Sequence, residues 1–345
     1  MNKLARREIE FDILRILAIL AVIMIHVSAP FVINYQPNSL QFTVGNIFDS
    51  ISRIGVPFFV LISGTFMLDE NKELSINKLS KKILKLLIIL IVWSAFYALV
   101  YNFHDFLNAF IYGHYHLWYL YFVIGLYLIT PILRKFVRIE NINIIYYFII
   151  LSLIFSYIPK TLDGLFSHSN SISKFSNLFS LNFVTGLTIY YLAGWLIKYD
   201  FLKIQKYKTF LYYACIISLI LIILFTQCRT TTTFSAYDYF YNNSNILVFI
   251  YSVALFIACK NYFSKKIRNI TDKTRNVLIK LSSLTFGVYL VHASILNLLI
   301  SIAKHLSIHS FILEIIILYM GTIILSFIIC YIISKIKYLN KLITI

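Results

Sequence analysis

The chain has 345 residues, of which 60% are hydrophobic and 13% are charged. Soluble domains carry roughly 25% charged residues, so a compact soluble protein of this composition would expose too much apolar surface. The soluble, disordered, collagen-like and coiled-coil classes are therefore excluded. A net charge of +17 would favour a nucleic-acid partner in a soluble chain, so its meaning depends on where the basic residues lie.

Ten hydrophobic segments have the length of a membrane span, because a bilayer core of about 30 Å needs about 20 mostly apolar residues. They cover residues 11–30, 46–68, 84–102, 116–133, 142–158, 179–197, 209–227, 244–260, 281–299 and 310–334. The second span is weakened by Asp49 and Arg53, and the sixth by its polar start. The sequence predicts an all-α integral membrane protein, a bundle of about ten transmembrane helices.

The basic residues are distributed unevenly between the loops of this bundle. With the N-terminus inside, the cytoplasmic segments hold 25 of the 31 Lys and Arg residues, and the outer segments hold only four. Cytoplasmic loops are generally enriched in Lys and Arg. We therefore expect a multi-pass protein of the cell membrane with both termini cytoplasmic. Its basic loops would contact membrane lipids, and a nucleic-acid partner is not expected.

Soluble domains and disulfides are not indicated. The four cysteines are scattered without paired spacing, which predicts neither a disulfide framework nor a metal site. The first span is not expected to be a cleavable signal peptide, because Pro30 follows the small residues and Asp12 and Arg15 interrupt the apolar run. Any chemistry is therefore expected within the bundle or at its mouths.

The first span contains three ionisable residues: Asp12, Arg15 and His26. Such groups are costly in a membrane unless they are paired or face water, so each is a candidate functional residue. Arg15 and His26, eleven residues apart, lie on one face of a helix and about 16 Å apart along it. Asp12 is close enough to Arg15 for an ion pair. The structural alternative is an interfacial pair with His26 as a packing residue.

Basic candidates also occur in the second and third spans. Arg53 lies in the outer half of the second span, where it either serves a site or extends to the membrane surface. Lys82 and Lys85 begin the third helix and share a face. They either hold anionic groups or enforce topology and bind anionic lipid.

Histidine and aromatic candidates lie in the outer halves of later spans. The fourth span begins with His116, Trp118 and Tyr119, and the ninth contains Tyr289 and His292. None of the eight histidines falls in an expected cytoplasmic segment. Basic charge inside and imidazole outside favour an anionic ligand from the cytoplasm and acid–base chemistry near the outer side.

Four segments, in order along the chain, resemble the motifs of membrane acyltransferase family 3. The hallmark of that family is an Arg in the first helix followed eleven positions later by a His, as in Arg15 and His26. The other matches are Arg53-Ile-Gly-Val-Pro-Phe-Phe with Ser63-Gly64, His116-Leu-Trp-Tyr-Leu with Tyr127-Leu-Ile-Thr-Pro131, and Gly287-Val-Tyr-Leu-Val-His292. The enterobacterial-common-antigen O-acetyltransferase subgroup fits best, since no extracytoplasmic hydrolase-like domain is appended.

The resemblance implies a single transmembrane acyltransferase domain over residues 1–345. It would move an acyl group, usually acetyl, from cytoplasmic acyl-CoA to a hydroxyl of a cell-surface or lipid-linked glycan, without a metal. The residues expected to carry this reaction fall into three groups. The catalytic group is His26, as general base or transient acyl acceptor, together with Arg15 and Asp12. Acetyl-CoA would be bound by Arg15, Lys82 and Lys85. The acceptor would be bound by Arg53, His116, Trp118, Tyr119, Tyr289 and His292. Many relatives have two arginines where Lys82 and Lys85 stand, and lysine lacks bidentate phosphate geometry.

Two other classes of function stay open. A transporter or flippase of lipid-linked sugars would need Gly- or Pro-interrupted helices in paired halves, whereas the chain has 10 Gly, 5 Pro and no visible repeat. A non-catalytic membrane subunit of a glycan synthase would leave Arg15 and His26 unexplained. The glycan, the acyl group and the oligomeric state are not determined by the sequence.

Overall fold

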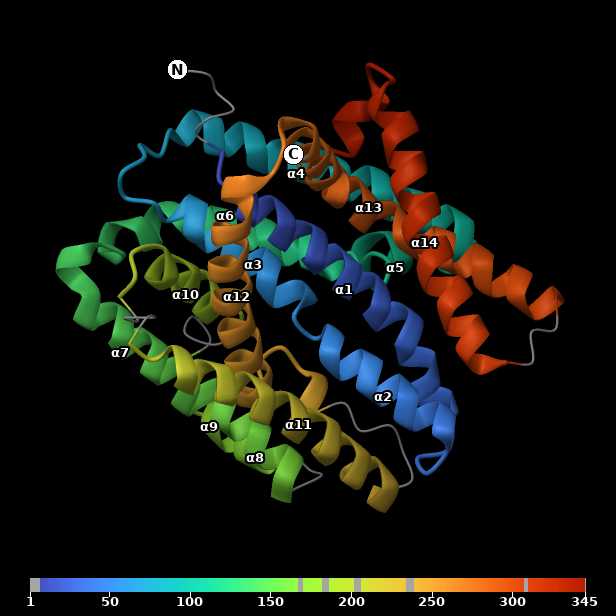
Figure 1. Cartoon of the computed structure of the whole chain (residues 1–345), viewed down its shortest axis with the longest axis horizontal. Helices are drawn as coiled ribbons and strands as arrows, with labels where there is room; N and C mark the ends of the chain where they lie inside the picture. Colours follow the sequence, from blue (N-terminus) through green and yellow to red (C-terminus); the bar gives the residue numbers. More distant parts are fainter. Residues whose placement is uncertain are drawn as a thin grey trace.

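The computed structural model describes residues 7–166, 170–181, 186–201, 206–233, 239–306 and 310–344, apart from the side chains of 231–233. The described residues form helices and turns, with no β-strand among them (Figure 1). The helices are α1 (Ile9–Asn34), α2 (Leu40–Ser52), α3 (Gly55–Met67), α4 (Ile76–Tyr101), α5 (Phe106–Tyr112), α6 (Trp118–Phe136), α7 (Ile142–Ser152), α8 (Ile158–Phe166), α9 (Ser171–Asn177), α10 (Thr188–Lys198), α11 (Lys208–Thr233), α12 (Ile246–Lys266), α13 (Asp272–His305) and α14 (Phe311–Ser334).

Nine helical stretches among the described residues are long and apolar enough to cross a membrane. They confirm the prediction of an all-α, multi-pass membrane protein. Their outward side chains are large and apolar, such as Leu128, Ile91 and Ile316, each more than half exposed. Such residues are stable on the outside of the bundle only where lipid replaces water.

The sixth expected span, 179–197, differs from the prediction. Within it the structure shows α10, which has only 11 residues, while 182–185 lie outside the described residues. Every residue of α10 from Thr188 to Ile197 is buried. Because protein surrounds α10 on all sides, it does not need the length of a lipid-facing helix.

Polar side chains define where several helices begin. Ser39, Ser75 and Thr271 accept hydrogen bonds from backbone N–H groups in the first turns of α2, α4 and α13. Asn245 and Ser310 do the same for α12 and α14. These caps satisfy backbone N–H groups that have no partner within the helix. Leaving such groups unpaired near a membrane costs free energy.

Helix α1 lies between two apolar cores. Phe11, Leu14 and Ala18 belong to a core shared with α3, α10 and α12. Ile19, Val22 and other α1 residues belong to a second core with α4, α6, α13 and α14. The polar residues of α1 are therefore held at the junction of two rigid packing units.

The second span is broken into α2 and α3, with Arg53 and Ile54 between them. Pro57 is tolerated because the first turn of α3 needs no intrahelical donor there. A Cβ at Gly55 would come within 2.8 Å of the Val22 side chain and 3.0 Å of its backbone nitrogen. The break and the glycine together let both half-helices pack closely against α1.

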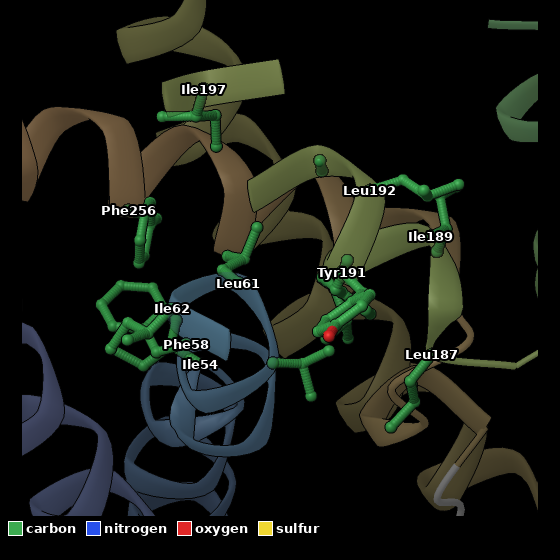
Figure 2. Close-up of a cluster of buried hydrophobic side chains, with 14 of the residues drawn as sticks. Ile54, Phe58, Leu61, Ile62, Leu187, Ile189, Tyr191, Leu192, Ile197 and Phe256 are labelled. Carbon is green, nitrogen blue, oxygen red and sulfur yellow. The ribbon is translucent and has the colours of Figure 1, made fainter. Parts of the chain in front are cut away.

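Helices α3 and α10 cross so closely that two positions at the crossing have no room for a Cβ atom. A Cβ at Gly64 would collide with the carbonyl oxygen of Tyr191, and one at Gly194 with that of Leu61. Thr65 spans the crossing, since its hydroxyl lies 3.1 Å from the Gly194 carbonyl oxygen. Figure 2 shows the apolar side chains around this crossing, with Phe58 and Leu61 from α3, Tyr191 and Leu192 from α10, and Phe256 from α12. Close backbone approach through small residues is a common way to pack helices in membranes.

Candidate active site

A cavity of about 660 Å³ lies beside the first two turns of α1. We call it the Arg15 cavity. Four cationic side chains line it, Arg7, Arg15, Lys72 and Lys82, against the carboxylates of Glu8 and Asp12. Hydroxyl groups add to this polar wall, from Ser63, Ser282, Ser283, Thr285, Thr344, Tyr119, Tyr127 and Tyr289. The lining suits an anionic ligand, because Arg and Lys bind phosphate and carboxylate oxygens most strongly.

Asp12 organises the charged end of this cavity. Its carboxylate is fully buried and accepts hydrogen bonds from Arg7 at 2.7 and 2.8 Å and from Arg15 at 3.0 Å. The Ser282 hydroxyl of α13 also donates to it, at 2.7 Å. Hydrogen bonding to Asp12 raises the pKa of Arg7, which lies just before α1. Asp12 therefore holds two guanidinium groups and joins α1 to α13.

Three cationic side chains lie close to the Phe66 ring at the same end of the bundle. Arg15 lies 5.5 Å, Lys72 5.3 Å and Lys198 5.9 Å from its centroid. Asp69, two residues beyond the end of α3, pairs with Lys198 at 2.5 Å and accepts a hydrogen bond from the Tyr199 hydroxyl at 2.9 Å. Burial alone would raise the pKa of Asp69, but the bonds from Lys198 and Tyr199 lower it further than burial raises it. This carboxylate links the ends of α3 and α10.

A second cavity, of about 470 Å³, lies beside the last turns of α1. We call it the Arg53 cavity. Its apolar wall comes from Ala29, Val32, Ile33 and Leu187. Its polar and aromatic wall comes from Asp49, Arg53, Trp118, Tyr241, Asn242, Asn243 and Ser244. The mixture of aromatic rings, amides and hydroxyls differs from the cationic wall of the Arg15 cavity.

Arg53 is held by contacts on three sides. It forms an ion pair with Asp49, one turn earlier on α2, whose side chain is 1% exposed. Its guanidinium also lies 4.2 Å from the Tyr241 ring centroid and donates to the Tyr241 carbonyl at 3.3 Å. The pair leaves this wall close to neutral. Arg53 thereby fixes the segment that carries Asn242, Asn243 and Ser244.

Neighbouring residues of α6 and α1 separate the two cavities. Trp118 lines the Arg53 cavity, whereas Tyr119 lines the Arg15 cavity with Tyr289. The Tyr289 hydroxyl donates to the His116 carbonyl at 2.5 Å, which ties α13 to the start of α6. On α1, Arg15 and Ala29 line opposite cavities, with His26 between them.

Four histidines, His26, His114, His116 and His292, form a chain of contacts between the two cavities, and we call this part of the bundle the dividing region. The His26 ring stacks on His292 at 5.2 Å and lies 5.0 Å from Tyr115. His292 lies 5.1 Å from His116, and the Nδ1 atoms of His116 and His114 are 3.0 Å apart. No group of three or more His, Cys, Asp or Glu side chains in the described residues is arranged to hold a metal ion.

The partners of His292 define its protonation. Its Nδ1 lies 2.7 Å from the Tyr289 carbonyl, which only accepts, so Nδ1 carries the proton and Nε2 is an acceptor in the neutral ring. His292 is fully buried, whereas His26 is half-buried. His114, in the segment before α6, has its pKa lowered to about 4 by burial and is neutral at pH 7.

The structure separates several residues that the sequence grouped together. Lys82 lines the Arg15 cavity, but Lys85 does not, since three residues along a helix turn the side chain by about 60°. Of the six residues expected around the acceptor, Arg53 and Trp118 line the Arg53 cavity, and Tyr119 and Tyr289 line the Arg15 cavity. His116 and His292 lie in the dividing region. Two of the eight histidines, His168 and His309, lie outside the described residues.

Some residues of these walls were not singled out by the sequence. Arg7 and Lys72 counted only toward topology, and Asp49 only as a weakness of its span. The spacing of Asp49 and Arg53, four apart inside an apolar run, was an available signal. The segment Tyr241–Ser244 carried none, because only the fold brings it opposite α2.

The fold and these two cavities define a multi-pass membrane protein with a polar site at each end and a histidine cluster between them. A family model described as an acyltransferase domain matches residues 8–333, so the chain belongs to this acyltransferase family. The match supports an acyltransferase activity for the chain. No match was found among curated proteins or among solved structures.

Proposed function

We propose that the protein transfers an acyl group, most simply acetyl, from cytoplasmic acyl-CoA to a hydroxyl of a glycan at the outer face of the cell membrane. The observation that carries this proposal is the placement of His26. It lies on one helix between a cationic cavity and a neutral, aromatic one. A reaction between a charged donor and a sugar acceptor from opposite sides of a membrane needs such an arrangement.

The Arg15 cavity is the proposed donor site. Acyl-CoA carries several phosphate charges, and Arg7, Arg15, Lys72 and Lys82 offer cationic donors to them. The thioester ends a long, flexible arm, and His26 lies about 16 Å along α1 from Arg15. Tyr119 and Tyr289 lie at the end of this cavity nearest the histidines. They would then line the path of the CoA arm rather than the acceptor site.

The Arg53 cavity is the proposed acceptor site. The Trp118 side chain is 43% exposed, and its flat face suits the apolar face of a sugar ring. Asn242, Asn243 and Ser244 supply amides and a hydroxyl for sugar hydroxyl groups. Ala29 lines this cavity one turn after His26, so an acceptor hydroxyl there would be close to the imidazole.

His26 would then act in one of two ways. As a general base it removes the proton of the acceptor hydroxyl while that oxygen attacks the thioester carbonyl, and the CoA thiolate leaves. As a nucleophile it first takes the acyl group and then passes it to the hydroxyl. In either case the stacked His292 ring keeps the His26 ring in place.

The proposal is tested with the purified protein in liposomes and radiolabelled acetyl-CoA. We expect label to appear in a glycan acceptor and free CoA thiol to be released in equal amounts. A protein that moves lipid-linked glycan without consuming acetyl-CoA would instead be a transporter. A protein that does neither, while restoring a glycan synthase in complex, would be a non-catalytic subunit.

A further inference from the structure

The segment that follows α14 folds back onto the bundle. Residues Leu339–Leu342 form a single 3-10 turn, and Ile343 beyond it is 1% exposed. In Figure 1 the end of the chain lies beside α4 and α13. These residues lie beyond the stretch 8–333 that the family model matches.

Two helices hold this segment in place. The indole N–H of Trp93 on α4 donates to the Leu342 carbonyl at 3.2 Å. On α13, Gly287 leaves the space that Ile343 fills, because a Cβ at Gly287 would lie 3.1 Å from the Ile343 Cβ and 3.2 Å from its carbonyl oxygen. The same Cβ would lie 3.0 Å from the Cys330 sulfur of α14. Gly287 therefore seats the segment through a close approach of backbone to backbone.

The next residue of the segment reaches the candidate site. Thr344 lines the Arg15 cavity together with Lys82 and Leu86 of α4 and Ser282 and Ser283 of α13. Its hydroxyl donates to the Asn340 carbonyl at 2.9 Å. The segment thus closes the cavity wall between α4 and α13.

We infer that the segment 339–344 is part of the donor-binding wall, and that its seating on Gly287 and Trp93 sets the affinity for acyl-CoA. This inference rests on the proposed function of the Arg15 cavity. Thr344 acts as a wall residue for the donor, and Gly287, Trp93 and Ile343 are positioning residues that act through it.

A chemical protection experiment tests the contact directly. Thr344→Cys protein in detergent is labelled with a charged maleimide, and the exposed native Cys228 serves as an internal reference. We expect CoA at about nine times its Kd, which occupies nine-tenths of the sites, to slow labelling at position 344 by about tenfold relative to Cys228. Equal labelling with and without CoA, at a CoA concentration that inhibits acetyl transfer, would overturn the inference.

A kinetic experiment tests the positioning role. Gly287→Ala and Ile343→Ala are expected to raise KM for acetyl-CoA by about tenfold, with KM for the acceptor unchanged. Gly125→Ala is the matched control, since a Cβ there meets nothing within 4 Å. Trp93→Phe removes only the indole donor and is expected to raise KM about threefold, which keeps the test valid if Gly287→Ala does not fold.

The two hypotheses fail in different ways. If the unaltered protein transfers no acetyl group from acetyl-CoA, the proposed function is wrong. If it transfers acetyl while all three positioning variants keep the normal KM for acetyl-CoA, only the donor-wall inference is wrong.

Discussion

Two buried carboxylates in the same bundle have different surroundings. Asp12, at the Arg15 cavity, accepts from Arg7, Arg15 and Ser282, so three groups share its charge. Asp49, at the Arg53 cavity, has Arg53 as its only cationic partner among the described residues. A cation can therefore leave Asp12 for a ligand without stranding a charge, whereas Arg53 cannot leave Asp49. The first arrangement suits binding of an anion, and the second suits a fixed wall.

The largest expected effect comes from the residue between the two cavities. His26→Ala should lower kcat by about 10²- to 10⁴-fold, the usual contribution of a general acid or base. KM for donor and acceptor should change little, because His26 lines neither cavity. Acetyl transfer in liposomes measures this, with the exposed His305→Ala as control. Normal transfer by His26→Ala would refute the proposed mechanism.

The Arg53→Ala variant tests whether the Asp49–Arg53 ion pair is needed to hold the wall of the Arg53 cavity. Arg53→Ala leaves the Asp49 carboxylate buried and unpaired, which costs about 3 kcal/mol or more of stability. We expect a lower midpoint of thermal unfolding in detergent and less monodisperse protein. The double variant Asp49→Asn/Arg53→Gln removes both charges and should recover much of that loss. If the single variant is as stable as the unaltered protein, the contrast between the two carboxylates disappears.

The Arg15→Ala variant tests whether Arg15 is free to leave Asp12 and bind the donor. Asp12 keeps Arg7 and Ser282 in Arg15→Ala, so the thermal midpoint should stay near that of the unaltered protein. KM for acetyl-CoA should rise about tenfold, equivalent to 1.4 kcal/mol, with KM for the acceptor unchanged. Arg15→Lys should recover part of the loss. A rise in acceptor KM instead would place the donor elsewhere.

The two lysines of α4 sharpen the boundary of the donor site. Lys82 lines the Arg15 cavity, so Lys82→Gln should raise KM for acetyl-CoA about threefold, as for a partly exposed charge contact of up to about 1 kcal/mol. Lys85→Gln removes the same charge three residues away and should leave KM within error. Equal effects of both variants would indicate long-range attraction rather than contact.

The smallest effect is expected at the link between α3 and α10. The pKa of Asp69 is lowered in the folded protein, so its stabilising contribution is present at pH 7 and is lost as pH falls through that lowered value. Asp69→Asn should therefore lower the thermal midpoint by a few degrees at pH 7. The difference from the unaltered protein should begin to shrink below about pH 4, near the ordinary Asp pKa, and should vanish only once the pH is below the lowered pKa. A difference that persists in acid would assign the effect to lost hydrogen bonds alone.

The all-α class and the apolar spans could be predicted from the sequence because their signals are local, whereas the orientation of the termini stays a prediction. Apolar length marks the spans, and basic residues mark one set of loops. Arg7 and Thr344 line the same cavity, so the two ends of the described chain lie at one end of the bundle. Helix α10 has only 11 residues and is not among the nine long apolar stretches of the described residues, although Leu187, just before it, lines the Arg53 cavity and Lys198 contacts Asp69 at the opposite end.

The sequence by itself determined the all-α membrane class, most of the apolar spans, and the spacing of Asp12, Arg15 and His26 along α1, since each depends on composition or on helical period. Only the tertiary structure decided which residues share a cavity. It gave Asp12 the distant partner Ser282, put Tyr241 over Arg53, and placed Trp118 and Tyr119 on different cavities. These contacts join residues far apart in the chain or separate adjacent ones. They depend on close helix crossings at positions such as Gly64 and Gly194, which helical spacing alone does not encode.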